Sequence, residues 1–301
     1  MGAVQAARAA TTGAALVVLS AACFGLQPVM ARIAYAAGMG VPAVLTYRFA
    51  IAVPLFWLAL AALRQPLRMA RRDAALLLLL GAVGYAAFST MYFEAVDLIP
   101  AAAAAGLLYA YPTLVAVTQA GLGRERVTAR LWLALGGATV GTLLVLGASA
   151  QGLRPLGTLL ALGAAVGYTI YLIVGHAVLA RVPPLPATAV MTSGAAFTLI
   201  GVAVLQGQAA PPASATGWAA VAGLAVVTTV VAVLALFAGM ARIGPTRASI
   251  LNTVEPLVTA ATAALVLGER LQVPQYLGIL LIVAAAGAAT RATAGSDKSP
   301  G

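Results

Sequence analysis

The sequence predicts an all-α integral membrane protein with ten transmembrane helices, arranged as two inverted five-helix repeats. Three observations lead to this fold class: a very apolar composition, an internal repeat with a period of 144 residues, and an uneven distribution of arginine between the loops. Together they predict how many times the chain crosses the bilayer and which loops share a side.

The composition excludes an ordinary soluble protein. Hydrophobic residues make up 62% of the chain and charged residues only 8%, with a mean hydropathy of +1.02. Soluble domains contain about 45–50% apolar and about 25% charged residues. Helices are expected rather than strands, because backbone groups in lipid must be hydrogen-bonded within the segment. A β-barrel would instead show alternating segments of about ten residues.

The chain contains two copies of one unit. The segments LYAYPTLVAVTQAGLGRERVTARLWLA and LNTVEPLVTAATAALVLGERLQVPQYLGILLI share their pattern of apolar run, proline and charged turn. A shift of 144 residues aligns Phe24 with Tyr168, Phe93 with Phe237, Ile99 with Ile243, Pro112 with Pro256, Glu125 with Glu269 and Arg126 with Arg270. Five spans per copy is an odd number, so the two copies are expected to insert with opposite orientations.

The first repeat is expected at 13–149, after a short cytoplasmic arm at 1–12. Its spans are set by apolar runs of about the 20 residues that cross the hydrocarbon. The spans are separated, in chain order, by an uncharged break, the loop RQPLRMARRD, the turn AVDLIP and the loop GRERVTAR. The five spans are predicted at 13–34, 42–63, 74–94, 99–122 and 131–149.

The second repeat is expected at 157–290, after a linker at 150–156. Its apolar runs are again close to the length that crosses the hydrocarbon. The polar, small-residue segment at 291–301 predicts a disordered cytoplasmic tail. The five spans are predicted at 157–180, 187–206, 217–239, 246–267 and 273–290.

The basic residues predict the orientation, because cytoplasmic loops of membrane proteins carry an excess of lysine and arginine. If both termini are cytoplasmic, thirteen of the 17 basic residues lie on the inner side and two on the outer side. Arg32 and Arg48 fall within spans. The net charge of +10 is therefore a topology signal rather than a sign of nucleic-acid binding.

The repeated segments resemble a known family. A proline in the middle of the fourth and ninth spans, with a GRER or GER turn after each, is similar to the EamA type of the drug/metabolite transporter superfamily. The resemblance covers residues 13–290. It implies transport of small metabolites, often export, through a central cavity between the repeats. Aromatic amino acid exporters are among the members of the superfamily that the chain resembles.

Polar and aromatic side chains inside the spans are few, so they are the candidates for contact with a solute. Each tyrosine could also be an interface anchor or a packed core ring. A tyrosine-lined cavity with few charges would suit flat, amphipathic solutes. The candidate substrate-binding residues are Tyr85, Ser89, Tyr92, Tyr109, Tyr111, Tyr168, Tyr171, Asn252 and Glu255.

Glu255 is the main candidate for coupling or substrate recognition. It lies about ten residues into span nine, or roughly 15 Å deep at 1.5 Å per residue. A charged acid at that depth costs at least about 2.5–3.5 kcal/mol. Three interpretations remain open: a structural acid bonded to backbone or a tyrosine, a ligand for a substrate amine, and a carrier of a coupling proton.

Three further residues are candidates for coupling or gating. Pro112 and Pro256 each free a backbone carbonyl one turn earlier, which can line a cavity. His176, near the inner end of span six, is either a packed or interfacial residue or part of a proton relay.

Arg48 and Glu94 are predicted to form an ion pair at the outer side. Arg48 lies one to two turns into span two, and Glu94 ends span three at the same face. Snorkelling of Arg48 and a contact with substrate are the alternatives.

The leading functional interpretation is a secondary transporter that exports amino acids, aromatic ones among them, or related amphipathic solutes. The alternatives are a multidrug or organic-amine efflux transporter, a metabolite uptake permease and, more remotely, a membrane-embedded enzyme. The chain has no phosphate-binding loop of the form G-x-x-x-x-G-K-[ST], so direct use of ATP is not expected. A single cysteine and a single histidine provide no cluster for a metal or for catalysis.

The expected setting is a bacterial-type inner membrane, with the lipid bilayer and a small-molecule substrate as partners. No cofactor and no nucleic acid are expected. Small residues are frequent throughout the spans, so their spacing does not specify a dimer, and a monomer or weak dimer is expected.

Overall fold

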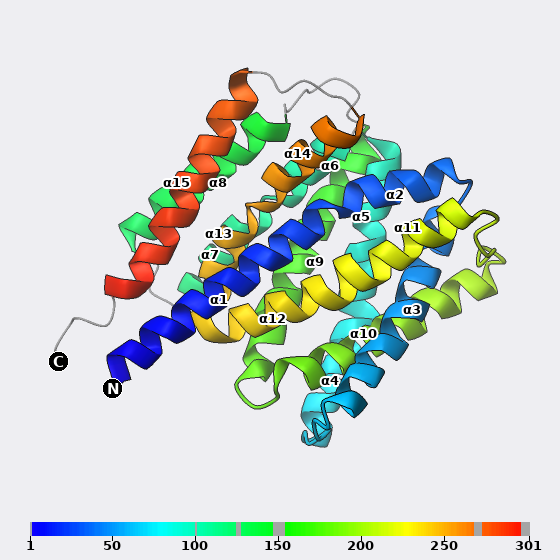
Figure 1. Ribbon diagram of the computed structural model, residues 1–301, viewed down its shortest axis with the longest axis horizontal. Helices are drawn as coiled ribbons and strands as arrows, with labels where there is room; N and C mark the ends of the chain where they lie inside the picture. Colours follow the sequence, from blue (N-terminus) through cyan, green and yellow to red (C-terminus); the bar gives the residue numbers. More distant parts are fainter. Residues whose placement is uncertain (1, 100, 125–127, 147–153, 268–272, 296–301) are drawn as a thin grey trace.

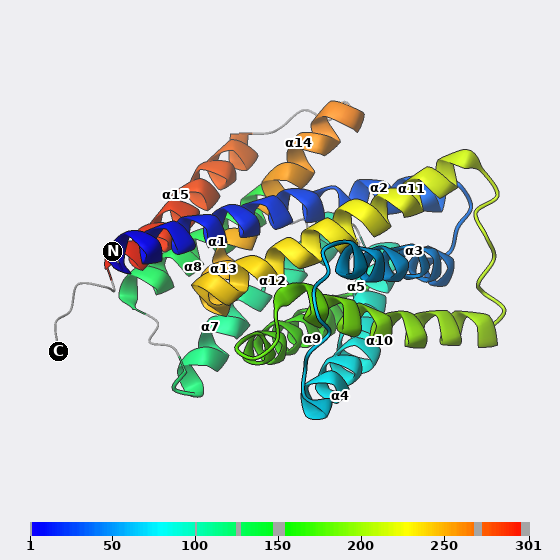
Figure 2. The same ribbon diagram turned by 60° about the horizontal axis from the view of Figure 1, so that its bottom comes forward.

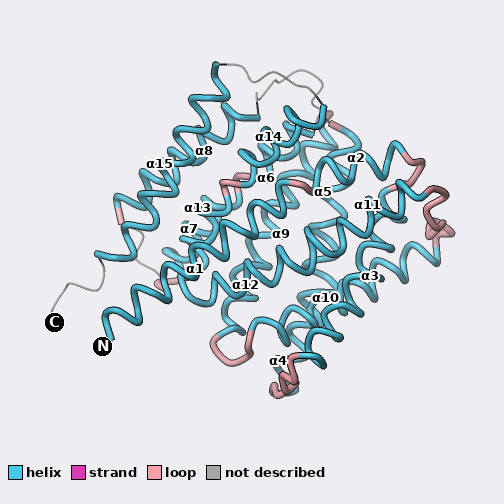
Figure 3. Tube along the Cα trace, in the orientation of Figure 1, coloured by secondary structure: helices cyan, strands magenta, loops and turns pink. Residues whose placement is uncertain are grey.

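The structure is a computed structural model that describes residues 2–99, 101–124, 128–146, 154–267 and 273–295. In these ranges the elements are helices joined by short loops, without a strand (Figure 3). Six of the described helical segments are long and apolar enough to cross a membrane: Arg8–Ala36, Val41–Ala62, Arg71–Leu98, Pro155–Leu179, Pro184–Leu205 and Ala215–Ile243.

The first half of the chain forms helices that pack side by side in an oblique bundle (Figure 1). They are α1 (Gly2–Gly25), α2 (Gln27–Ala36), α3 (Val41–Ala62), α4 (Arg71–Leu79), the π-helical segment η1 (Leu80–Tyr85), α5 (Ala86–Leu98), α6 (Ala101–Leu108), α7 (Tyr111–Gly121) and α8 (Ala129–Leu146).

The second half follows the same order, except that one continuous helix, α9, takes the place of the pair α1 and α2. Its elements are α9 (Pro155–Leu179), α10 (Pro184–Leu205), α11 (Ala215–Ala225), the π-helical segment η2 (Val226–Val231), α12 (Ala232–Ile243), α13 (Pro245–Asn252), α14 (Glu255–Leu267) and α15 (Val273–Gly295).

Two helices break at positions related by the 144-residue repeat. α6 ends at Leu108 and α13 ends at Asn252, and in each case two residues separate the helix from the next one. Pro112 and Pro256 occupy the second position of α7 and α14. A proline has no N–H for the preceding turn, and its ring clashes with the carbonyl four residues earlier, so the helix ends before it. The backbone at both breaks is therefore free to contribute to a cavity.

The two π-helical segments lie in corresponding helices of the two halves. A π-helical turn is wider than an α-helical one and commonly occurs at functional sites. In η2 the hydroxyls of Thr228 and Thr229 both donate to the carbonyl of Leu224, each at 2.8 Å. This bonding satisfies a backbone carbonyl that the wider turn would otherwise leave without a partner.

Helix α10 packs directly on the end of α4 and on η1 through two glycines. A Cβ atom at Gly81 would overlap the carbonyl oxygen of Met191, and one at Gly194 would overlap that of Leu78. Small residues let membrane helices approach closely where no hydrophobic driving force operates between them. These glycines hold the cavity-facing η1 against the second half of the chain.

The helix ends differ from the predicted ends in places. α1 begins at Gly2, inside the expected arm, because its first two turns are rich in alanine, the strongest helix former. α15 continues to Gly295, beyond the predicted end at residue 290. The rest of the expected tail, and residues 150–153 of the linker expected at 150–156, lie outside the described residues, and α9 begins within that linker at Pro155.

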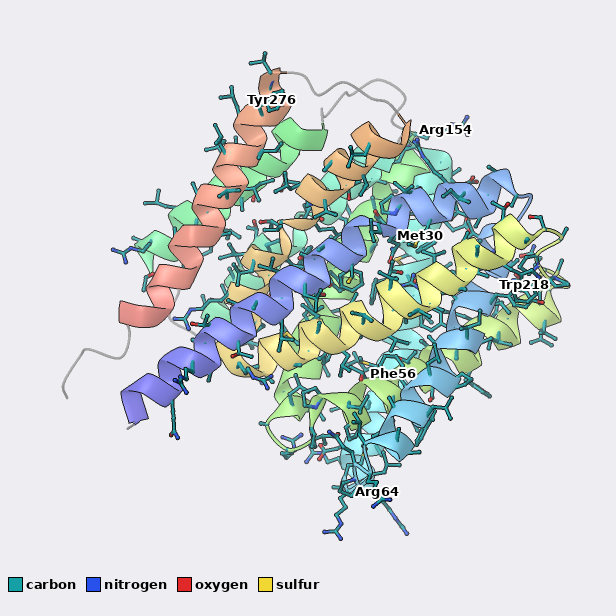
Figure 4. All side chains as sticks on the ribbon, in the orientation of Figure 1. Met30, Phe56, Arg64, Arg154, Trp218 and Tyr276 are labelled. Atoms are coloured by element: carbon teal, nitrogen blue, oxygen red, sulfur yellow. The ribbon has the colours of Figure 1, made fainter. Side chains whose placement is uncertain are left out.

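The beginning of α1 and the end of α15 lie close together at one end of the bundle (Figures 1 and 2). Arg64, just after α3, and Arg154, just before α9, lie at opposite edges of the molecule (Figure 4). This arrangement places the ends of the helical region on a common side.

Candidate functional site

A cavity lies between the two halves of the chain, at the level of the helix breaks. Its internal volume is about 60 Å³. Both halves contribute side chains to it, and this central cavity is lined by Phe24, Gln27, Arg48, Tyr85, Phe88, Ser89, Tyr92, Phe93, Leu108, Tyr111, Tyr168, Tyr171, Val233, Leu236 and Glu255.

Aromatic rings form one continuous wall of the central cavity. Tyr85 stacks on Phe88 with ring centroids 5.1 Å apart, and Phe88 lies 5.1 Å from Tyr168. Tyr168 meets Tyr111 edge-on at 4.7 Å and stacks near Tyr171 at 5.8 Å. Offset and edge-on pairs of this kind contribute about 0.5–1.5 kcal/mol each beyond burial of area. The wall is therefore a rigid apolar surface with hydroxyl groups at its edges.

Glu255 forms the acidic part of the cavity, at the first position of α14. The amide Nδ2 of Asn252 donates to Glu255 Oε2 at 3.4 Å and to Tyr111 Oη at 3.1 Å. Tyr111 in turn donates to the backbone carbonyl of Ser249 at 3.4 Å. Helix α1 presses against this break, since a Cβ on Gly25 would lie 2.9 Å from the Glu255 carbonyl oxygen. The broken helix thus positions a carboxylate next to an amide and a phenol.

Arg48 supplies a positive charge to the same cavity. Its side chain is 2% exposed, and its Nε donates to Thr229 Oγ1 at 2.7 Å. Nη2 lies 3.4 Å from the Thr228 carbonyl oxygen. The guanidinium carbon is 5.4 Å from the ring centroid of Phe49 and 5.6 Å from that of Phe93, which is the range of cation–π attraction.

The predicted outer ion pair between Arg48 and Glu94 is wrong. In the described part of the chain no ion pair joins these residues: Arg48 lines the central cavity, whereas Glu94 lines a separate pocket. Arg48 enters the bundle far enough for the threonines of η2 to replace a carboxylate as hydrogen-bond partners. Its charge is therefore available to the cavity.

Most of the predicted substrate-contacting residues come together in the central cavity. The two that do not line it are Tyr109 and Asn252, which lie directly behind it. The Tyr109 ring is 6.1 Å from that of Tyr111, and Asn252 bonds to two lining residues. Those that line it are Tyr85, Ser89, Tyr92, Tyr111, Tyr168, Tyr171 and Glu255.

The other candidates for coupling and gating lie elsewhere. Pro112 and Pro256 are buried at the starts of α7 and α14, beside the two helix breaks. His176 is in the last turn of α9, is only partly buried and does not line the central cavity. Its Nδ1 atom is buried without a hydrogen-bond partner among the described residues.

Several lining residues were missed, and two of them left a signal in the sequence. Phe24 aligns with Tyr168 under the 144-residue shift, and Phe88 lies three positions after Tyr85, on the same helical face. Gln27 is the first residue of α2 and precedes Pro28. α1 ends at Gly25, so a single residue separates the two helices. The other missed residues are apolar ones that sequence does not distinguish from core: Phe93, Leu108, Val233 and Leu236.

A second, acidic pocket of about 620 Å³ is lined by residues of the α2–α3 and α10–α11 turns and of the end of α5. Glu94 and Asp97 are its charged residues, and the polypeptide around Gly38 and Pro211 forms its walls. We call it the acidic vestibule. Within the described residues, no group of three or more His, Cys, Asp or Glu side chains is arranged to hold a metal ion.

Comparison with known proteins identifies the family. The model of the EamA-like transporter family matches twice, at residues 11–147 and 155–290. The Uncharacterized transporter YcbK of Bacillus subtilis (strain 168) is 29% identical over 283 residues, which cover 90% of each chain. A solved crystal structure of a protein with 22% sequence identity has a TM-score of 0.77 and covers 96% of this chain and 99% of its own, so the fold is shared. With two copies of the family's unit spanning most of its length, the chain belongs to the EamA-like transporter family.

Proposed function

We propose that the protein is a secondary transporter that exports amino acids, aromatic ones among them, or related amphipathic solutes through the central cavity. The observation that carries the proposal is that one aromatic-walled cavity, built from both halves, contains the carboxylate of Glu255. Amino acids combine an amino group with a side chain that such rings can contact. The amine is expected to meet Glu255 and the apolar side chain to meet the tyrosine wall.

The proposed topology has ten membrane spans in two inverted repeats, with both termini in the cytoplasm of a bacterial-type cell. The two family matches and the paired helix breaks support a duplicated unit. The position of Arg64 and Arg154 at opposite edges supports opposite exposure of the loops that carry them (Figure 4). An odd number of spans per unit then relates the two units by inversion.

Alternating access is the proposed mechanism. The cavity of about 60 Å³ is small beside the roughly 300–1,000 Å³ of typical ligand pockets, so the two halves must separate for a solute to enter. The breaks before Pro112 and Pro256 give the fourth and ninth spans two short helices each, which can tilt with little loss of hydrogen bonding. We propose these breaks as the hinges.

An organic-amine efflux transporter is the second candidate. The same carboxylate and the same rings would bind an amine without a carboxylate. The two candidates make different predictions for a solute that carries both an ammonium and a carboxylate group.

Solute exchange in proteoliposomes tests the proposal. Purified protein is reconstituted, loaded with unlabelled L-phenylalanine, and the uptake of labelled L-phenylalanine is followed between pH 5 and pH 9. Exchange above empty liposomes is expected, and Glu255→Gln is expected to lower it and to flatten its pH dependence. Glu94→Gln, which removes a carboxylate outside the central cavity, is the matched control. The proposal would be contradicted if neither L-phenylalanine nor the amine 2-phenylethylamine exchanged faster than in empty liposomes.

A further inference from the structure

The guanidinium of Arg48 is a buried charge without a counter-ion. Among the described residues no carboxylate lies within ion-pairing distance, and no group accepts a hydrogen bond from Nη1. Its contacts are two threonine oxygens and two phenyl faces. An unpaired charge inside a membrane protein is costly, and such residues usually mark a substrate path.

The two ionisable groups of the central cavity are not paired with each other. Arg48 and Glu255 line the same cavity, from α3 in the first half and α14 in the second, but they do not form an ion pair. Aromatic rings line the same cavity. The cavity therefore has a guanidinium and a carboxyl group beside an apolar wall.

We propose that Arg48 binds the carboxylate of the transported solute, so that the site selects α-amino acids. The carboxylate would accept hydrogen bonds from Arg48, the ammonium group would donate to Glu255, and the side chain would lie on the tyrosine wall. This inference rests on the proposed function and narrows its substrate class, since an organic amine would leave Arg48 unpaired.

A carboxylate fits this site better than a phosphate or an inorganic anion. A phosphate ester carries close to two negative charges, whereas the described lining of the cavity has one cation, Arg48, and also an acid, Glu255. A small inorganic anion would make no use of the rings. The guanidinium forms strong hydrogen bonds to a planar carboxylate through parallel N–H groups.

The π-helical segment η2 positions Arg48 for this role. The wide turn brings the Thr229 hydroxyl next to the Leu224 carbonyl. The hydroxyl donates a hydrogen bond to this carbonyl and accepts one from Arg48 Nε. The bond fixes one edge of the guanidinium on η2, and Arg48 still lines the cavity. Thr229 is therefore a positioning residue that acts through Arg48.

The test compares three probes of one ring size: L-phenylalanine with both charges, 2-phenylethylamine without the carboxylate, and 3-phenylpropionate without the amine. Binding to the full-length protein in detergent is measured by calorimetry, and counterflow is measured in proteoliposomes. The variants are Arg48→Gln, Arg48→Lys and Thr229→Val. Arg154→Gln, an exposed arginine at the start of α9, is the matched control.

The wild-type protein is expected to bind L-phenylalanine at least about tenfold more tightly than 2-phenylethylamine, the scale of one charge-assisted hydrogen bond. Arg48→Gln is expected to remove this preference while the preference for L-phenylalanine over 3-phenylpropionate remains. Thr229→Val is expected to weaken the first preference and Arg48→Lys to retain part of it. Arg154→Gln is expected to match the wild type.

Two results would overturn the carboxylate site. One is a wild-type protein that binds 2-phenylethylamine with the same affinity as L-phenylalanine. This result does not depend on the folding of any variant. The other is an equal loss of all three probes in Arg48→Gln, which would indicate a structural arginine. Both leave the transport proposal standing, whereas a wild-type protein that neither binds nor moves any probe contradicts both proposals.

Discussion

Arg181 and Asp73 form a salt bridge of 2.7 Å between the two halves of the chain, with Nε of Arg181 also 3.2 Å from each carboxylate oxygen. Asp73 lies in the first turn of α4, and Arg181 follows α9. The Asp73 side chain is 7% exposed and that of Arg181 is 56% exposed. The hydrogen bond to Asp73 raises the pKa of Arg181, which favours the ionised form of the guanidinium.

Removal of one partner of this salt bridge is expected to lower the stability more than removal of the other. Arg181→Gln leaves a buried carboxylate without its partner, whereas Asp73→Asn leaves an exposed arginine that water can solvate. The apparent melting temperature of the detergent-solubilised protein should therefore fall further in Arg181→Gln. A double variant that is no more stable than Arg181→Gln would contradict this account.

The contact between α10 and η1 predicts opposite effects for two glycines in one helix. Gly194→Ala places a methyl group against the backbone of Leu78 and is expected to cost about 1–3 kcal/mol by overpacking. Gly201→Ala meets no atom within 4 Å and is expected to be neutral or to stabilise by about 0.5–1 kcal/mol, since alanine favours helix. Thermal unfolding of both variants checks the prediction. An equal loss in both would show that α10 does not pack on η1 in this way.

The aromatic wall predicts that ring contact matters more than the hydroxyl at Tyr168. Tyr168→Ala removes ring contacts with Phe88, Tyr111 and Tyr171 and is expected to lower L-phenylalanine counterflow severalfold or more. Tyr168→Phe keeps those contacts and is expected to retain most of the rate. Tyr276→Ala, a tyrosine that is 55% exposed, serves as the control. A Tyr168→Ala protein with the wild-type rate would place the solute elsewhere.

The proposed topology predicts which loops a membrane-impermeant thiol reagent can reach. In a variant with Cys23 replaced by alanine, a cysteine at Pro211 should react from outside intact cells, because Pro211 lines the acidic vestibule and is exposed. A cysteine at Arg68, also exposed, should react only after the membrane is permeabilised. Labelling of both from outside would contradict the assignment of cytoplasmic termini.

The sequence by itself determined the helical class, the duplicated unit and seven of the 15 side chains that line the cavity. The reason is that each depends on local chemistry. A composition with 8% charged residues requires spanning helices, and a proline ends a helix wherever it occurs, so Pro112 and Pro256 mark both breaks. Polar side chains are costly in lipid, so Glu255 and the tyrosines are drawn to the interior of the bundle.

Only the tertiary structure decided the partners of the charged side chains. Arg48 and Thr229 are 181 residues apart, and Arg181 and Asp73 are 108 apart, with no sequence pattern linking either pair. The prediction that Arg48 pairs with Glu94 assumed that charges near the same face meet. The packing of η2 on α3 instead gave Arg48 a closer acceptor, because the rotation and depth of each helix depend on its contacts with neighbouring helices.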